Sequence, residues 1–133
     1  PIFIYAPNTT FKGETDNYFQ QTDITPTVLN LLGTKDTIIS FGNDAFSKGE
    51  KFVVNYISNT YQIYMGDYFL QFDGEKTIGL YYTKTDKLIN NNLLNFLDNK
   101  LHLRAKNKLE TKLKAIIQQY NNRLITNSLS YRE

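Results

Sequence analysis

The sequence of 133 residues predicts an α+β fold built from three parts. A short apolar run opens the chain, four short alternating segments separated by turn-forming pairs follow, and apolar residues at steps of three and four mark its end. We therefore expect an apolar strand with a short helix, a four-stranded antiparallel meander and a long C-terminal helix. Residues 1–50 are predicted to end a larger α/β domain, and residues 51–133 to form a C-terminal subdomain.

The first element is an apolar strand over residues 2–6 (IFIYA). A short continuous run of β-branched and aromatic residues is typical of a strand buried on both faces of an α/β sheet. A buried strand at the very start, preceded only by Pro1, indicates that the chain was cut from a longer one. A tag removed by a protease would leave the same start without Met.

A polar loop over residues 8–21 follows this strand. Ligands of open α/β sheets gather at the carboxyl ends of the strands, so Asn8 and Thr9 would lie at the mouth of a site. There they could donate hydrogen bonds to an anionic substrate, and they are our candidate substrate-binding residues. The alternative is a local turn in which both side chains bond to nearby backbone.

The second element is a short helix over residues 22–33. A capping side chain and Pro26 mark its start, and Gly33 marks its end. A broad apolar face predicts that this helix is largely buried. That face comprises Val28, Leu29, Leu31 and Leu32.

The third element is an antiparallel meander whose strands are separated by turn-forming residues. The tyrosine-rich composition predicts a sheet with one packed face and one face near water. A row of aromatic side chains could also stack sugars or bases. The predicted strands are residues 51–57, 60–65, 67–72 and 77–83, and the turns contain Ser58-Asn59, Gly66-Asp67 and Asp73-Gly74.

The last element is a long helix with one apolar stripe. Its start lies either at a capping box formed by Asn107 and Glu110 or earlier, near Asn99. Residues 100–133 hold eight basic and two acidic residues, whereas residues 1–99 hold seven basic and eleven acidic ones. Such a basic stripe is either the solvated face of an amphipathic helix or a surface for anionic membranes. The apolar stripe of this helix contains Leu109, Leu113, Ile116, Ile117, Tyr120 and Leu124.

The residue types restrict the chemistry of this chain. There is no Cys, which excludes disulfides, thiolate metal sites and a Cys nucleophile. The only His, His102, lies among cationic neighbours and is expected to be a solvated surface residue. No zinc-protease, phosphate-loop or dinucleotide-binding motif occurs. We therefore predict no catalytic and no metal-binding residue in this portion. Nucleic acid is not an expected partner, because basic and aromatic residues occupy different segments.

Three segments carry a family likeness when they are taken in order. The apolar run ending at Pro7, followed by residues 21–33 (QTDITPTVLNLLG), resembles a late segment of sulfatases. Residues 40–47 (SFGNDAFS) are similar to a stretch of lipoteichoic acid synthases and related phosphoglycerol transferases. Residues 80–93 (LYYTKTDKLINNNL) resemble part of the sulfatase C-terminal subdomain. Together they resemble the C-terminal portion of an enzyme of the alkaline-phosphatase superfamily.

The resemblance implies a parent protein that acts on sulfate or phosphate esters with a divalent metal, which is Mn, Mg, Zn or Ca. The metal ligands and the nucleophile, a Thr or a formylglycine, would precede residue 2. The metal would lower the pKa of the nucleophile and neutralise charge on the transferred group. This portion alone is expected to be inactive and to need no cofactor of its own. Its partner would be the upstream catalytic domain of the same polypeptide.

The resemblance also implies a location at the extracytoplasmic face of the cell membrane or in the periplasm. The parent would take an anionic ester or a phospholipid as its substrate, and an exposed sheet edge could promote a homo-oligomer. Two departures from the sulfatase pattern favour the transferase branch, since Tyr82 replaces an Asp and Lys87 replaces a Pro. Asn8 lies where some members place a metal-binding His. Asp23 and Pro26 match the pattern, and we assign them a structural role.

One alternative from a different class stays open. The chain could be a stand-alone binding module that uses its tyrosine-rich sheet for glycans, or its basic helix for a membrane surface.

Overall fold

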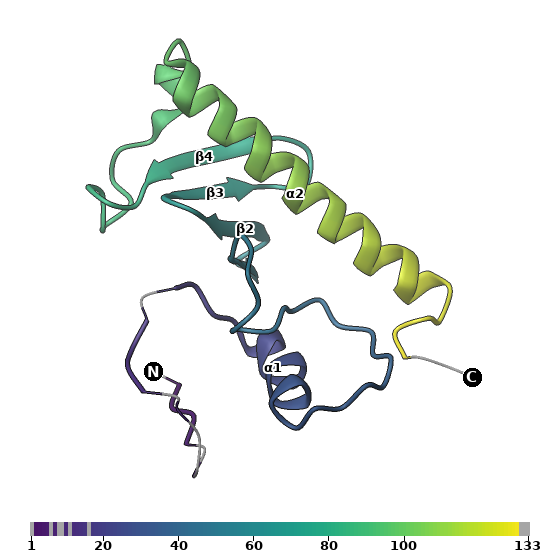
Figure 1. Cartoon of the computed structure of the whole chain (residues 1–133). Coiled ribbons are helices and arrows are strands. Elements are labelled where there is room, and N and C mark those ends of the chain that lie inside the picture. Colours follow the sequence, from purple (N-terminus) through teal and green to yellow (C-terminus); the bar gives the residue numbers. More distant parts are fainter. Residues whose placement is uncertain (1, 6, 8–9, 11, 16, 131–133) are drawn as a thin grey trace.

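The computed structural model describes residues 2–5, 7, 10, 12–15 and 17–130. Figure 1 shows the sheet with a long helix across one face, and a short helix with its loops beside them. The α+β class, with its antiparallel sheet and C-terminal helix, is therefore confirmed.

The sheet is an antiparallel meander in the order β1-β2-β3-β4. Local turn chemistry sets this topology. Ser58 and Asn59 adopt positive φ angles of 51° and 58° between the first two strands, and Gly66 has a φ of 58° in the next turn. The strands match the predicted ones to within one residue at each end. They are β1 Phe52–Ile57, β2 Thr60–Met65, β3 Tyr68–Phe72 and β4 Thr77–Tyr82.

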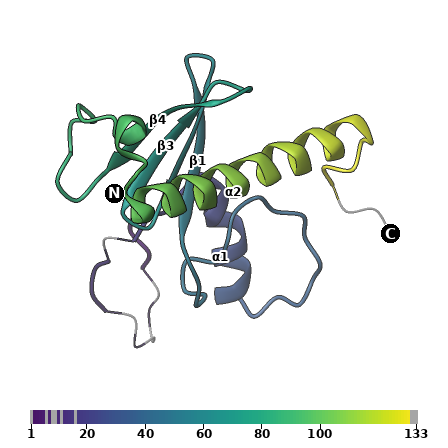
Figure 2. The same ribbon diagram turned by 90° about the horizontal axis from the view of Figure 1, so that it is seen from above.

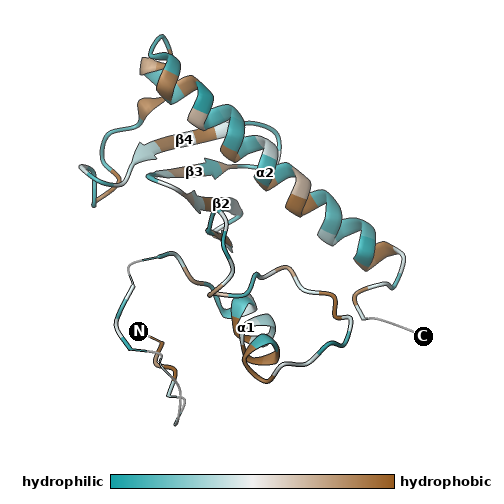
Figure 3. Cartoon of the chain, viewed as in Figure 1, coloured by the Kyte–Doolittle hydropathy of each residue, from teal (hydrophilic) through white to brown (hydrophobic). Residues whose placement is uncertain are grey.

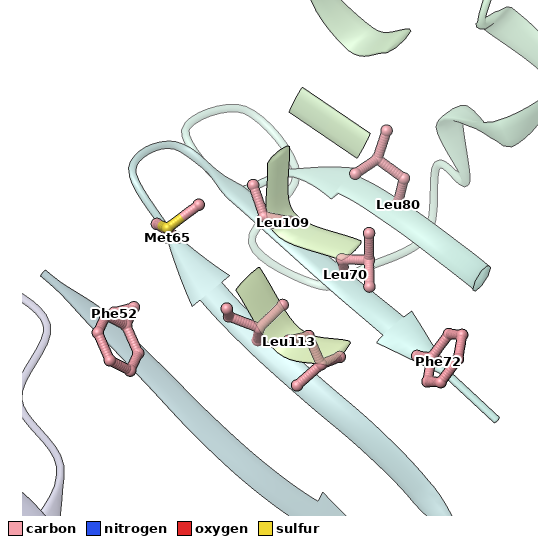
Figure 4. Packing of buried hydrophobic residues seen from close by; sticks show 8 residues of the cluster. Phe52, Met65, Leu70, Phe72, Leu80, Leu109 and Leu113 are labelled. Carbon is pink, nitrogen blue, oxygen red and sulfur yellow. The ribbon is translucent and has the colours of Figure 1, made fainter. Parts of the chain in front are cut away.

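The long helix α2, Lys100–Ile125, packs its first half on the sheet (Figure 2). It begins at the earlier of the two predicted positions, because the Asn99 side chain accepts a hydrogen bond from the Leu101 backbone at 2.9 Å. The second half extends beyond the sheet, so Tyr120 and Leu124 of the predicted stripe are exposed. In Figure 4, core side chains of the helix and strands point toward one another. The core cluster is Phe52, Ile63, Met65, Leu70, Phe72, Leu80, Leu109 and Leu113.

A short 3-10 turn, Gln21–Asp23, leads into the short helix α1, Ile24–Leu31, and Gly33 ends it with a φ of 69°. The helix itself is confirmed, but its predicted burial is wrong. Thr27 is its only buried residue, whereas Val28 and Leu32 are exposed. The apolar colouring of α1 in Figure 3 lies away from the sheet and α2, which bury their own apolar faces against each other.

The strand predicted over residues 2–6 is wrong for residues 2–5. These residues form no strand, and Phe3 and Tyr5 are 87% and 90% exposed. Ala6 lies outside the described residues. The physical reason is that a strand needs a neighbour for its backbone hydrogen bonds, and the described sheet pairs only β1 to β4 with one another.

A second 3-10 helix, η2 Leu93–Phe96, connects β4 to α2. Its Leu93 and Leu94 pack against the edge of the core cluster. It therefore extends the apolar core past the last strand.

Candidate functional site

The two residues predicted to bind substrate, Asn8 and Thr9, lie outside the described residues. Their assignment stays a prediction. The family-like segments over residues 21–33, 40–47 and 80–93 are described, and their polar residues form two hydrogen-bonded units.

The first unit joins the start of α1 to the loop that follows it, and we call it the clamp (residues 20–27 and 42–45). Asp23 is 4% exposed and lies at its centre. One carboxylate oxygen accepts a hydrogen bond from the Gln20 backbone N–H at 3.0 Å. The other accepts one from the Asn43 backbone N–H at 2.7 Å. Asp23 therefore closes the 3-10 turn that leads into α1 and ties it to a loop twenty residues away.

Thr27 makes a second connection within the clamp. Its buried hydroxyl donates to the Asp23 carbonyl at 2.6 Å and accepts from the Ala45 backbone N–H at 2.8 Å. Gly42 lies so close to the chain that an added Cβ would be 2.1 Å from the Thr22 carbonyl oxygen. Only glycine fits there. The first two family-like segments are therefore joined by these hydrogen bonds.

The side chain of Gln20 links the clamp to the sheet edge. The Gln20 side-chain oxygen accepts a hydrogen bond from the Val54 backbone N–H at 2.9 Å, on β1. A ring contact between Phe41 and Tyr120, with centroids 5.5 Å apart, links the same region to the far part of α2. Few contacts thus hold the clamp against the rest of the molecule.

The second unit lies in the third family-like segment. The Asp86 carboxylate accepts hydrogen bonds from the Asn90 and Asn91 backbones at 3.0 and 2.8 Å, and these bonds lower its pKa. The Asn92 side chain accepts from the Leu80 N–H at 3.2 Å and donates to the Ile78 carbonyl at 3.0 Å. Asn92 thereby satisfies backbone groups of the edge strand β4. Sequence reasoning missed this role, because the partners lie on another element.

The basic helix is largely engaged in contacts within the chain. Glu110 lies between Lys106 and Lys114, with N–O distances of 2.6 and 2.5 Å, and accepts from the Thr77 hydroxyl at 2.8 Å. Burial by itself would raise the pKa of Glu110, but these three hydrogen bonds lower that pKa to about 2. Lys112 lies over the ring of Phe52, 4.6 Å from its centroid.

His102 is not the solvated residue that its neighbours predicted. It is half-buried and forms a hydrogen bond of 3.0 Å between its Nδ1 atom and the Tyr68 hydroxyl. Burial, and then the nearby Tyr82 and Asp67, raise the pKa of Tyr68. The pair fixes the first turns of α2 against β3.

The aromatic residues of the meander do not form one ladder. Tyr56 and Tyr61 pair on the face that carries the core, with ring centroids 4.6 Å apart. Tyr64 stacks on the buried Phe69 on the opposite face, at 4.2 Å. This distribution supports the packed interpretation, since sugars could not stack along rings on two faces at once.

A hollow of about 800 Å³ lies beside Tyr18, and we call it the lysine hollow. Four segments surround it: residues 17 and 18, the loop before β1, the turn between β2 and β3, and the chain after β4. Four lysines line it, namely Lys48, Lys51, Lys84 and Lys87, together with Glu50 and Asp67. No local sequence motif marks these residues, because only the fold brings the four segments together.

The described part of the chain holds no group of three or more His, Asp or Glu side chains positioned to bind a metal ion. No helix within it is both long and apolar enough to cross a membrane.

Comparison with known proteins leaves the family open. No family model matches the chain, and no curated protein matches it either.

Proposed function

We propose that this chain is the C-terminal portion of a metal-dependent enzyme of the sulfatase and phosphoglycerol transferase class, and that it supports the catalytic domain without taking part in the chemistry. The observation that carries the proposal is the clamp. Two family-like segments, separated in sequence, meet through the side chains of Asp23 and Thr27.

The hydrogen bonds of these two side chains explain why the motif requires those residue types. Asp23 and Thr27 are 4% and 1% exposed, and both bond to backbone groups of the chain itself. A catalytic carboxylate or hydroxyl must instead face its substrate. The motif therefore serves to position the loop, in agreement with a structural role.

Exposed apolar residues support a partner on one side of this unit. Ile24, Val28 and Leu32 recur at steps of four along α1 and its end, and all three are exposed. The run Ile2–Tyr5 is exposed as well. Burial of apolar surface contributes about 25 cal/mol per Å², so covering both features would stabilise an assembly. We propose that they pack against the upstream catalytic domain of the same polypeptide.

In this proposal the catalytic domain supplies the divalent metal and the nucleophile. The metal lowers the pKa of the nucleophile and neutralises charge on the sulfuryl or phosphoryl group. The substrate is an anionic ester or a phospholipid, and the site faces outward from the cell membrane or into the periplasm. The residues described above hold the loop and the sheet edge in place.

The test compares two polypeptides in one assay of ester hydrolysis with added Mn²⁺. We expect the 133-residue chain to release no nitrophenol from 4-nitrophenyl phosphate or sulfate. The product of the whole open reading frame that contains it should release nitrophenol, and chelation of the metal should abolish that release. Metal-dependent turnover by the 133-residue chain would contradict the proposal. A reading frame without an upstream Asp-His pair and a Thr, Ser or Cys nucleophile would contradict it too.

A further inference from the structure

We propose that the lysine hollow binds a sugar phosphate. The proposal goes beyond the function proposed above and does not rest on it, because it concerns a separate group of side chains and is tested on this chain alone.

The charges in the hollow are only partly balanced. Lys84 forms an ion pair with Asp67 at 2.9 Å. Glu50, the other acidic residue of the lining, is engaged by Lys108 at 2.6 Å. Within the described residues, Lys48 and Lys87 have no carboxylate at ion-pair distance. A dianionic group in the hollow would supply the negative charge that these two lysines lack.

The third lysine is held by neutral groups. The Lys51 ammonium donates to the Asp44 carbonyl at 2.7 Å and to the Ser47 hydroxyl at 3.0 Å. Its charge is therefore fixed in position without being neutralised. A phosphate group suits such a site, because it accepts hydrogen bonds on several oxygens and carries up to two negative charges.

The rest of the lining favours a ligand with hydroxyl groups. The hollow is much larger than a single ion needs, and its volume falls within the range of small-molecule sites. Asp67 and Ser47 are among the lining residues, and carboxylate and hydroxyl oxygens are acceptors for sugar hydroxyls. Tyr18 adds an aromatic surface at the same wall, next to Tyr64 at a ring distance of 5.7 Å.

The wall on the side of the sheet is fixed before any ligand binds. Thr83 donates from its backbone and its hydroxyl to the Asp67 carbonyl, at 2.9 and 3.0 Å. The Tyr18 hydroxyl lies 3.3 Å from the same Thr83 hydroxyl. A ligand would therefore meet a preformed surface and lose little affinity to reorganisation.

The experiment is a titration of the ¹⁵N-labelled chain with glucose 6-phosphate at low salt, followed by NMR. We expect saturable shifts of the Gly66, Asp67 and Lys84 amides. The double variant K48Q/K87Q should bind about tenfold more weakly. The control K35Q/K100Q removes the same charge from residues outside the hollow and should bind like the original chain. Circular dichroism should show that both variants are folded.

Three results would overturn the proposal. The first is a titration in which these amides do not shift. The second is an equal loss of affinity in the two double variants, which would indicate attraction by net charge alone. The third is equal affinity for inorganic phosphate and glucose 6-phosphate, which would show that the hydroxyl groups are not recognised.

Discussion

The sheet with α2 and the clamp with α1 are held together by different forces. Every buried apolar residue of the described chain lies in the sheet or in α2. The buried residues of the clamp are Asp23 and Thr27, and both are polar. The first region is thus stabilised by apolar burial, which is strong and not directional, whereas the second depends on a few directional hydrogen bonds.

The two kinds of interaction contribute differently to the stability of the two regions. A buried aliphatic side chain contributes about 1.5–3 kcal/mol, whereas a hydrogen bond contributes a net 0.5–1.5 kcal/mol. The sheet and α2 should therefore unfold together as the stable unit, and the clamp should open at a lower free energy. Hydrogen bonds fix the conformation of the clamp. The exposed apolar side chains of α1 therefore remain available for contact with a partner.

The largest expected effect comes from a substitution in the shared core. Leu113 is fully buried between α2 and the sheet. The substitution L113A should lower the free energy of unfolding by about 2–5 kcal/mol in urea titrations, because it removes apolar contacts and leaves a cavity. L101A on the same helix is the control, since Leu101 is 67% exposed and should change stability by less than about 0.5 kcal/mol. Equal effects of the two would refute the assigned core.

The next effect is a dependence on pH that originates at Glu110. The pKa of its side chain is about 2 in the folded chain and 4.5 in its ordinary state. The stability from this shift is fully present above pH 4.5 and is lost as the pH falls toward 2. Its size is on the order of 2–3 kcal/mol, because solvent reaches part of the ion pairs and reduces the full conversion of the shift. Unfolding of the chain and of E110Q, measured from pH 6 to pH 2, should differ in this window. Identical slopes would contradict the lowered pKa.

A substitution in the clamp should act locally. T27V keeps the shape of the side chain but removes the hydroxyl that bonds to Asp23 and Ala45. Opening of the clamp should become easier by about 1–2 kcal/mol, measured by hydrogen exchange of the Asn43 amide, whose acceptor Asp23 is unchanged. The urea midpoint of the sheet should stay unchanged. The control is T25V, at an exposed position on the same helix. An equal effect of T25V would show that the helix propensity of valine explains the result.

The smallest effect concerns the contact between β3 and α2. Y68F removes the hydroxyl that bonds to His102 and should cost about 1 kcal/mol of stability. Y56F is a suitable control, because Tyr56 is 58% exposed and should be nearly neutral. If Y68F left the free energy of unfolding unchanged, ring packing alone would hold the start of α2.

Local signals predicted the sheet and α2 well. The pairs Ser58-Asn59 and Gly66-Asp67 define turns by their own backbone preferences, and the stripe through Leu109 and Leu113 defines the face of α2. Two competing caps left the start of α2 open, and the Asn99 side chain fixes it.

The remaining features depend on residues distant in sequence. The run at residues 2–6 has the composition of a strand, but composition does not specify a pairing partner. Asp23 bonds to Asn43 across twenty residues, and Lys48 and Lys87 line the same hollow. No periodicity connects such positions. The family-like pattern led us to assign Asp23 a structural role, but it did not show that Asp23 bonds to Asn43.

The most direct test of the difference between the two regions is amide hydrogen exchange in the intact chain, followed by NMR under native conditions. The amides of β2 and β3, which have strands on both sides, should exchange only through global unfolding. The Asn43 and Ala45 amides, which bond to Asp23 and Thr27, should exchange through local opening at a lower free energy. Equal free energies of opening in the two regions would contradict the account, because the clamp would then be part of the same cooperative core.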